Sequence, residues 1–276
     1  MPGQIEVACV QSCATLDTEA NLAGLRAGIA AAADRGADLI CLPEYCATYG
    51  RIAARLEVGA AAEPEHGALT ELREAAIAHR IWLAIGSLGV RAEDGRIWNR
   101  SFLVDPKGAV RARYDKIHLF DVDLPSGESY RESATIAPGE RAVLADTPWA
   151  RIGLSICYDL RFPQLYRALA QAGAELLLVP AAFTRTTGRA HWHVLLRARA
   201  IETGCFVVAA SQCGTAPDGT LARYGHSLIV APWGEILADG GEEPGIVSAA
   251  LDLDRVAAAR AAIPSLRHDR PFELSV

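Results

Sequence analysis

Long hydrophobic runs are missing from this sequence of 276 residues. The apolar stretch at residues 176–179 ends at Pro180, whereas a membrane-spanning helix needs about 18 apolar residues in succession. The first residues, MPGQIEV, contain neither the basic segment nor the long apolar segment of an export signal. We therefore expect neither a membrane span nor export.

A strongly basic composition is missing too. Lys and Arg number 27 against 33 Asp and Glu, which gives a net charge of −6, and the two signs are mixed along the chain. Nucleic acids and anionic lipid surfaces attract proteins through clustered positive charge. We therefore expect no nucleic acid and no membrane among the partners.

The seven cysteines include no CxxC pair. Such pairs are typical of zinc knuckles, iron–sulfur clusters and thioredoxin-like sites, so we expect none of these. Cys9 and Cys41 stand in the apolar runs VACV and LICL, where cysteine behaves as a small buried hydrophobic residue. An odd number of thiols in such surroundings favours a reduced protein in the cytoplasm.

Phosphate-binding signatures are missing as well, because neither GxxxxGK[ST] nor GxGxxG occurs. The chain does contain 51% hydrophobic and 22% charged residues, enough for a sizeable core. No linker, repeat or low-complexity tract divides it. We therefore predict one domain over residues 1–276.

Hydrophobic periodicity predicts strands that alternate with helices and hairpins. We expect helices at residues 18–33, 64–80, 191–202 and 254–262, and one that begins at Pro163, a residue favoured in the first helical turn. We expect strands at residues 5–11, 38–42, 81–90, 97–104, 110–114, 151–157, 175–179, 205–211, 226–231, 236–238 and 246–251. Crossovers combined with hairpins predict an α/β protein with a mixed sheet and helices on its faces.

Two residues that can carry chemistry stand at the ends of predicted strands. Glu44 follows the strand at 38–42, and Cys157 ends the strand at 151–157, on the face that it shares with Gly153 and Ser155. Ligands of open α/β sheets bind at strand ends. From this pattern alone, Cys157 is either a functional thiol or another buried cysteine, and Glu44 is either catalytic or a capping carboxylate.

Other polar residues have ordinary interpretations. His191 and His193 lie two residues apart on a predicted helix, where their side chains point about 200° apart, so we expect no metal site. Lys116 in isolation is typical of an exposed lysine. Glu132 belongs to a carboxylate-rich segment that is typical of a solvated loop.

Three ordered blocks connect these residues to a known family. LPEY at 42–45, YDKIHLF at 114–120 and ICYDLRFP at 156–163 resemble the catalytic blocks of the nitrilase superfamily of carbon–nitrogen hydrolases. The resemblance runs nearly end to end and is closest to the Nit branch of amidases, through PAAFT, TGRAHW, LLRARAIE, YGHS and PWG. LLRARAIE and YGHS are more similar to amidases of deaminated glutathione than to ω-amidases. His193 departs from the pattern, because many relatives have Glu there.

This resemblance implies an α/β fold of the nitrilase type, a four-layer αββα sandwich with mixed sheets. It implies a homodimer or larger homo-oligomer, paired through the helical layers. Cys157 would be the nucleophile, Glu44 the general base, and Lys116 with the backbone N–H of Tyr158 the donors to the oxyanion. Glu132 would orient Lys116 and the attacking water. Neither a metal nor an organic cofactor is implied.

The same resemblance implies the substrate class. Arg161 would bind a substrate carboxylate through two parallel hydrogen bonds, and Phe183 and Thr187 would line the same pocket. We expect a small amide with a carboxylate: deaminated glutathione first and α-ketoglutaramate second, since both have a five-carbon 2-oxo acid end. A general aliphatic amidase or an N-carbamoyl hydrolase is the alternative.

Two other interpretations are weaker. A papain-like pair of Cys157 with His118 or His226 lacks the usual residues around the cysteine. An interaction protein that keeps the fold but has lost catalysis is disfavoured, because Glu44, Lys116 and Cys157 are all present.

Overall fold

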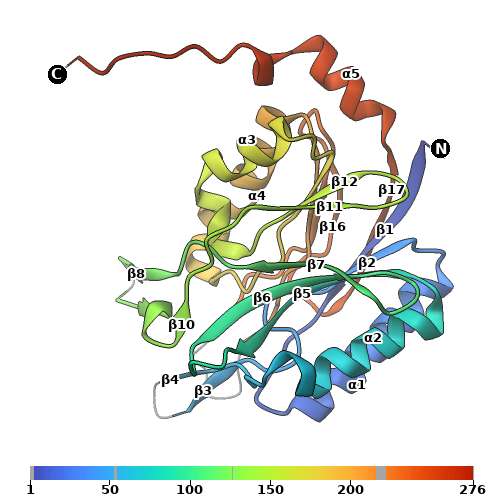
Figure 1. Ribbon diagram of the computed structural model, residues 1–276, viewed down its shortest axis with the longest axis vertical. Coiled ribbons are helices and arrows are strands. Elements are labelled where there is room, and N and C mark those ends of the chain that lie inside the picture. The colour runs from blue at the N-terminus through green and yellow to red at the C-terminus, as the bar shows by residue number, and fades with distance from the viewer. Residues whose placement is uncertain (1–2, 53–54, 126, 216–221, 276) are drawn as a thin grey trace.

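The structure, a computed structural model, describes residues 3–52, 55–125, 127–215 and 222–275. Two β-sheets lie face to face between two pairs of helices (Figure 1). The predicted four-layer αββα arrangement with mixed sheets is thereby confirmed.

The first sheet is built around three parallel strands, β1 (Gln4–Gln11), β2 (Leu39–Cys41) and β5 (Trp82–Arg91). Its order is β10-β6-β5-β2-β1-β17, with β7 also paired to β6. The remaining strands of this sheet are β6 (Ile97–Val104), β7 (Val110–Asp115), β10 (Ile136–Ala137) and β17 (Gly245–Asp252).

The second sheet has the order β11-β12-β13-β14-β15-β16 and is also mixed. Its parallel centre consists of β12 (Arg151–Leu154), β13 (Leu176–Leu178) and β14 (Phe206–Ala209). Antiparallel strands flank this centre: β11 (Val143–Asp146), β15 (Leu228–Val230) and β16 (Ile236–Asp239).

Alternation along the strands determines how the layers pack. Val7 and Cys9 on β1 point into the core shared with the second sheet, whereas Ala8 and Val10 pack with the helices α1 and α2. Helices α1 (Thr18–Asp34) and α2 (Gly67–His79) cover the first sheet. Helices α3 (Pro163–Gln171) and α4 (Arg185–Thr203) cover the second.

The chain leaves these four layers after β17. Helix α5 (Asp254–Ala262) and the residues behind it extend away from the sheets (Figure 1). Phe272 in this tail is 90% exposed. Among the described residues, no helix is both long enough and apolar enough to cross a membrane.

Several predicted boundaries are wrong. The strand expected at 151–157 ends at Leu154, because Cys157 takes a positive φ and begins the 3₁₀ turn η3 (Cys157–Arg161). The helix expected at 64–80 begins at Gly67, after the separate turn η1 (Glu63–Glu65). The helix expected at 191–202 begins six residues earlier, where the Thr184 hydroxyl caps the first turn.

The sequence analysis did not predict two short hairpins. They are β3 (Gly50–Ile52) with β4 (Arg55–Glu57), and β8 (Asp121–Asp123) with β9 (Ser129–Arg131). Strands of three residues are too short to show a periodic pattern. The second hairpin is as solvated as expected, but Glu132, which opens the next 3₁₀ turn η2 (Glu132–Ala134), is buried, so the loop interpretation was wrong for this residue.

Candidate active site

A cavity of about 380 Å³ contains all four side chains that the sequence proposed for catalysis. Glu44 lies in the loop after β2, Lys116 directly after β7, Glu132 at the start of η2 and Cys157 at the start of η3. The two sheets, which meet face to face, bring these distant segments together. All four side chains are buried.

Lys116 is the centre of a buried charge network. Its ammonium donates to Glu44 Oε1 at 2.9 Å and to Glu132 Oε2 at 2.8 Å. Burial alone would lower the pKa of Lys116, but the carboxylates of Glu132 and Glu44 raise it well above its ordinary value. Lys116 therefore carries a positive charge at neutral pH.

Further donors hold the two carboxylates in place. Asn99 Nδ2 on β6 donates to Glu44 Oε1 at 2.9 Å and to Glu132 Oε1 at 3.3 Å. The Tyr45 hydroxyl and the Phe120 backbone N–H donate to Glu132, at 3.1 and 2.7 Å. Because these donors come from three parts of the chain, the carboxylates have little freedom to turn away.

Cys157 sits on a strained turn. Its φ of +48° lies in the left-handed region, which is costly for a residue with a Cβ and typical of functional turns. Its backbone N–H donates to Pro180 O at 2.9 Å, which anchors the turn to the end of β13. The thiol is thereby held inside the cavity.

Burial raises the pKa of the Cys157 thiol well above its ordinary value, and the charge of Glu44 raises it further. Lys116 acts in the opposite direction but does not outweigh them. The resting side chain is therefore a neutral thiol hydrogen-bonded to Glu44. The second oxygen of that carboxylate, Oε2, accepts from the Ala182 backbone N–H at 2.8 Å, so one oxygen of Glu44 is anchored by backbone.

Only some of the predicted substrate-binding residues line the cavity. Tyr158, Phe183 and Thr187 line the cavity. Arg161 is not among the described lining residues; its guanidinium lies 5.3 Å from the ring centroid of Phe183 and 5.8 Å from that of Tyr158. Its Nη1 is 3.2 Å from His191 Nδ1.

Sequence reasoning missed other residues of this cavity. Arg51, from the β3–β4 hairpin, lines it with its guanidinium 5.3 Å from the ring centroid of Tyr130. Arg131 lines it from β9, although it is paired with Asp123. Asn99 could have been noticed as an amide inside a predicted strand, whereas nothing in the sequence marked the arginines.

The two histidines of the papain-like alternative lie elsewhere. His118 pairs with Asp159 at 2.7 Å and stacks on Phe162, and His226 pairs with Asp239 at 2.8 Å. Neither is among the described residues that line the cavity. The geometry thus favours a carboxylate, not an imidazole, as the base beside Cys157.

Known proteins are similar to this chain in sequence and in fold. Residues 6–261 match the family described as carbon-nitrogen hydrolase. A deaminated glutathione amidase of Synechocystis is 43% identical over 240 residues, which are 85% of this chain and 86% of that protein.

Solved structures of related proteins have a similar fold. Nit3 of Saccharomyces cerevisiae, described as a member of branch 10 of the nitrilase superfamily, superposes with a TM-score of 0.84 at 29% identity and covers 96% of each chain. A mutant amidase of Nesterenkonia sp. AN1, with the acetamide moiety of fluoroacetamide added covalently at its active-site cysteine, gives 0.76 at 31% identity and covers 96% of this chain and 97% of that one. With this fold and these matches over most of its length, the chain belongs to the carbon–nitrogen hydrolase family of the nitrilase superfamily and is a C–N hydrolase.

Proposed function

We propose that this enzyme hydrolyses deaminated glutathione, a small amide with carboxylates, through a thioester on Cys157. One observation carries the mechanism: a buried thiol shares a cavity with a carboxylate that is held by a buried ammonium. The curated relatives named for this activity, 40–43% identical over most of the chain, support the substrate.

The first half of the reaction forms the thioester. Glu44 takes the proton of the Cys157 thiol while the sulfur attacks the amide carbon. The carbonyl oxygen becomes an oxyanion, which Lys116 Nζ and the Tyr158 backbone N–H stabilise. When the C–N bond breaks, protonated Glu44 returns the proton to the departing nitrogen, and the amine leaves.

The second half releases the acid. Glu44, again ionised, takes a proton from water as the water attacks the thioester carbon. The C–S bond then breaks, and the sulfur recovers the proton from Glu44. Glu132 keeps the Lys116 ammonium in place through both halves and helps to orient the water. Every proton that moves is accounted for by Glu44, Cys157, water and the amine.

The cavity suits a small organic anion. Its volume of about 380 Å³ lies within the ~300–1,000 Å³ typical of small-molecule sites. Arg51 lines it, and Arg161 packs over the lining residue Phe183. Guanidinium groups bind carboxylates through paired hydrogen bonds, so two arginines near one cavity favour an acidic amide.

A substrate comparison tests this function. We expect kcat/KM to be highest for deaminated glutathione, lower for α-ketoglutaramate, and lower again for propionamide, which has no carboxylate. Product release is measured as free amine or ammonia. Equal activity on propionamide and deaminated glutathione would contradict the proposal and favour a general aliphatic amidase.

We also propose that the protein works as a homodimer or larger assembly in the cytoplasm. Val194 and Ile201 on α4, together with Trp233, are more than half exposed, a surface that a second subunit could cover. All seven cysteines are free thiols, which suits a reducing compartment. Light scattering after size exclusion measures the mass, and a monomer would contradict the assembly.

A further inference from the structure

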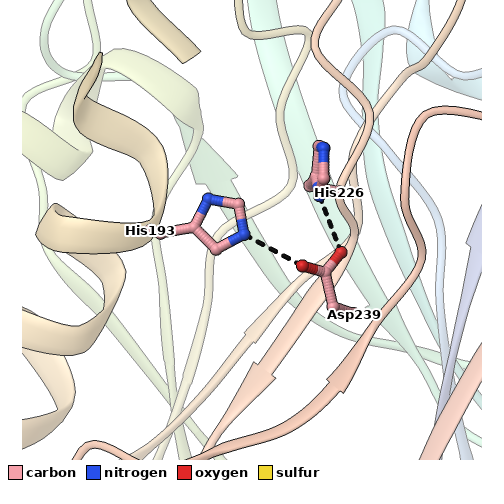
Figure 2. A group of neighbouring side chains, drawn as sticks. All are labelled: His193, His226 and Asp239. Carbon is pink, nitrogen blue, oxygen red and sulfur yellow. Dashed lines mark hydrogen bonds and ion pairs between the residues drawn. The ribbon is translucent and has the colours of Figure 1, made fainter. Parts of the chain in front are cut away.

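His193, His226 and Asp239 form a cluster of side chains (Figure 2). His193 belongs to α4, His226 precedes β15 and Asp239 ends β16. His193 Nε2 lies 3.0 Å from Asp239 Oδ2, and His226 Nδ1 lies 2.8 Å from Oδ1. Two imidazoles are thus directed at the two oxygens of one carboxylate.

Contacts other than the one to Asp239 hold His226 in position. Its φ of +52° is left-handed, and its backbone N–H donates to Gly241 O at 2.6 Å. Trp192 Nε1 donates to the carbonyl of His226 at 2.8 Å, and the ring of Tyr224 stacks on the imidazole at 4.4 Å. The imidazole is therefore preorganised by its surroundings.

Asp239 carries a negative charge. Burial would raise its pKa, but hydrogen bonds from His193, the Gly241 backbone N–H and His226 outweigh burial and lower the pKa below its ordinary value. The Gly241 bond to Oδ1 measures 2.9 Å and fixes one carboxylate oxygen. The cluster thus combines a fixed carboxylate with two imidazole nitrogens directed at it.

We propose that His193, His226 and Asp239 bind one divalent transition-metal ion, for which Zn²⁺ is the probe. Their ligand atoms all lie within 4.8 Å of one another. In a zinc site each ligand atom lies about 2.0–2.2 Å from the ion, so two ligand atoms are at most roughly 4.4 Å apart. Small rotations of the side chains would bring the three ligand atoms to these distances. Two imidazoles and one carboxylate are one of the sets of three protein ligands found in open zinc sites.

Partial exposure allows an ion to enter. The side chains of His193, His226 and Asp239 are 28%, 20% and 32% exposed. Water can therefore complete the coordination. The sequence had predicted no metal because His191 and His193 point apart on one helix. The partners of His193 come instead from the segment before β15 and from the end of β16.

The proposed ion does not belong to the reaction in the cavity. None of its three ligands is among the described residues that line the cavity. The cluster's nearest link to the cavity is Trp192, whose ring packs on Phe183 with centroids 4.9 Å apart and whose Nε1 donates to the His226 carbonyl. Zn²⁺ binding therefore needs no catalytic group, and it can succeed or fail independently of the proposed amidase activity.

Calorimetric titration of the untagged chain of 276 residues with Zn²⁺ tests the site. We expect one equivalent to bind the wild type and to raise its Tm, since an ion that binds only the folded state stabilises it. His193→Ala and Asp239→Asn should each weaken binding by at least the ~10–100-fold typical of losing an outer partner. His79→Ala, which removes an exposed histidine of α2, should bind as the wild type does.

The absorption spectrum of the protein with Co²⁺ shows independently whether a thiolate is among the ligands. Co²⁺ bound by nitrogen and oxygen lacks the sulfur-to-cobalt charge-transfer absorption that a thiolate ligand such as Cys157 would produce. The proposal is overturned if the wild type binds no equivalent of Zn²⁺ or if both cluster variants bind it as tightly as the wild type. A thiolate absorption band with Co²⁺ would also overturn it. If His193→Ala fails to fold by circular dichroism, Asp239→Asn, which keeps the side chain's shape, decides the outcome.

Discussion

Lys116 Nζ lies 2.9 Å from Glu44 Oε1, and the two side chains are only 2% and 3% exposed. A buried ion pair is costly to desolvate and is retained where its geometry is well satisfied. Here Glu132 and Asn99 complete the hydrogen bonding on both sides of the pair. The same ammonium that would stabilise an oxyanion thus also holds the proposed base in place.

The carboxylate of Glu44 should control the thiol directly. Glu44→Gln removes the negative charge that raises the pKa of Cys157, so this pKa should fall, whereas kcat should drop by at least ~10²-fold without the base. The pH dependence of iodoacetamide alkylation measures the thiol pKa. Glu140→Gln, an exposed carboxylate outside the cavity, is the control; an unchanged or higher thiol pKa in Glu44→Gln would refute the coupling.

Removal of the thiol should stop turnover at the covalent step. Cys157→Ala should have no measurable amidase activity while it keeps the wild-type circular dichroism spectrum, because only a small side chain is lost. Mass spectrometry of the wild type with a slow amide should find the acyl group on Cys157. Cys46→Ala, a buried thiol that does not line the cavity, should keep both activity and adduct; an active Cys157→Ala enzyme would exclude the mechanism.

Lys116 should matter for stability as well as for rate. Lys116→Met leaves Glu44 and Glu132 buried without their cation, a change that typically costs about 3–5 kcal/mol. Unpaired buried carboxylates have raised folded-state pKa values, so the folded variant binds extra protons and regains stability as the pH falls. Urea unfolding at about pH 8 and about pH 5 should therefore show the smaller loss at the lower pH.

The control for this measurement is Lys107→Met, which removes an exposed lysine and should change the free energy of unfolding very little. A Lys116→Met variant as stable as the wild type at both pH values would show that the network does not depend on the ammonium.

Hydrophobic periodicity in the sequence predicted many of the strands and helices, because neighbouring residues largely determine where such elements form. The strand at 97–104 and the helix at 254–262 were predicted at their observed bounds, and both have clear periodicity or flanking signals. Cys157 and Glu44 were found at strand ends, and the family resemblance added Lys116 and Glu132. Their catalytic roles stay predictions.

The remaining features depend on contacts between distant segments. Glu132 looked solvated because its partners Lys116, Asn99 and Tyr45 are 16, 33 and 87 residues away along the chain. Arg51 reaches the cavity from a hairpin too short to show a pattern. Charged residues of this kind become recognisable as site residues only when the sheets have placed them.

The two arginines should distinguish the two ends of the substrate. The five-carbon 2-oxo acid is the acyl group that would be attached to Cys157, and Arg161 lies in the same turn η3. Arg161→Lys should therefore raise KM for both deaminated glutathione and α-ketoglutaramate, because lysine cannot form the paired hydrogen bonds. Arg51, on a different element, suits the second carboxylate, which only deaminated glutathione has in its leaving group. Arg51→Lys should raise KM for deaminated glutathione alone.

Steady-state kinetics with three substrates check this division. Propionamide has no carboxylate, so its kcat/KM should be the same in the wild type, Arg161→Lys and Arg51→Lys. If Arg161→Lys changes neither acidic substrate while Arg51→Lys weakens both, the acyl carboxylate binds Arg51 inside the cavity, and the role proposed for Arg161 is wrong. If both variants slow propionamide as much as the acids, the arginines support the structure of the site and do not recognise the substrate.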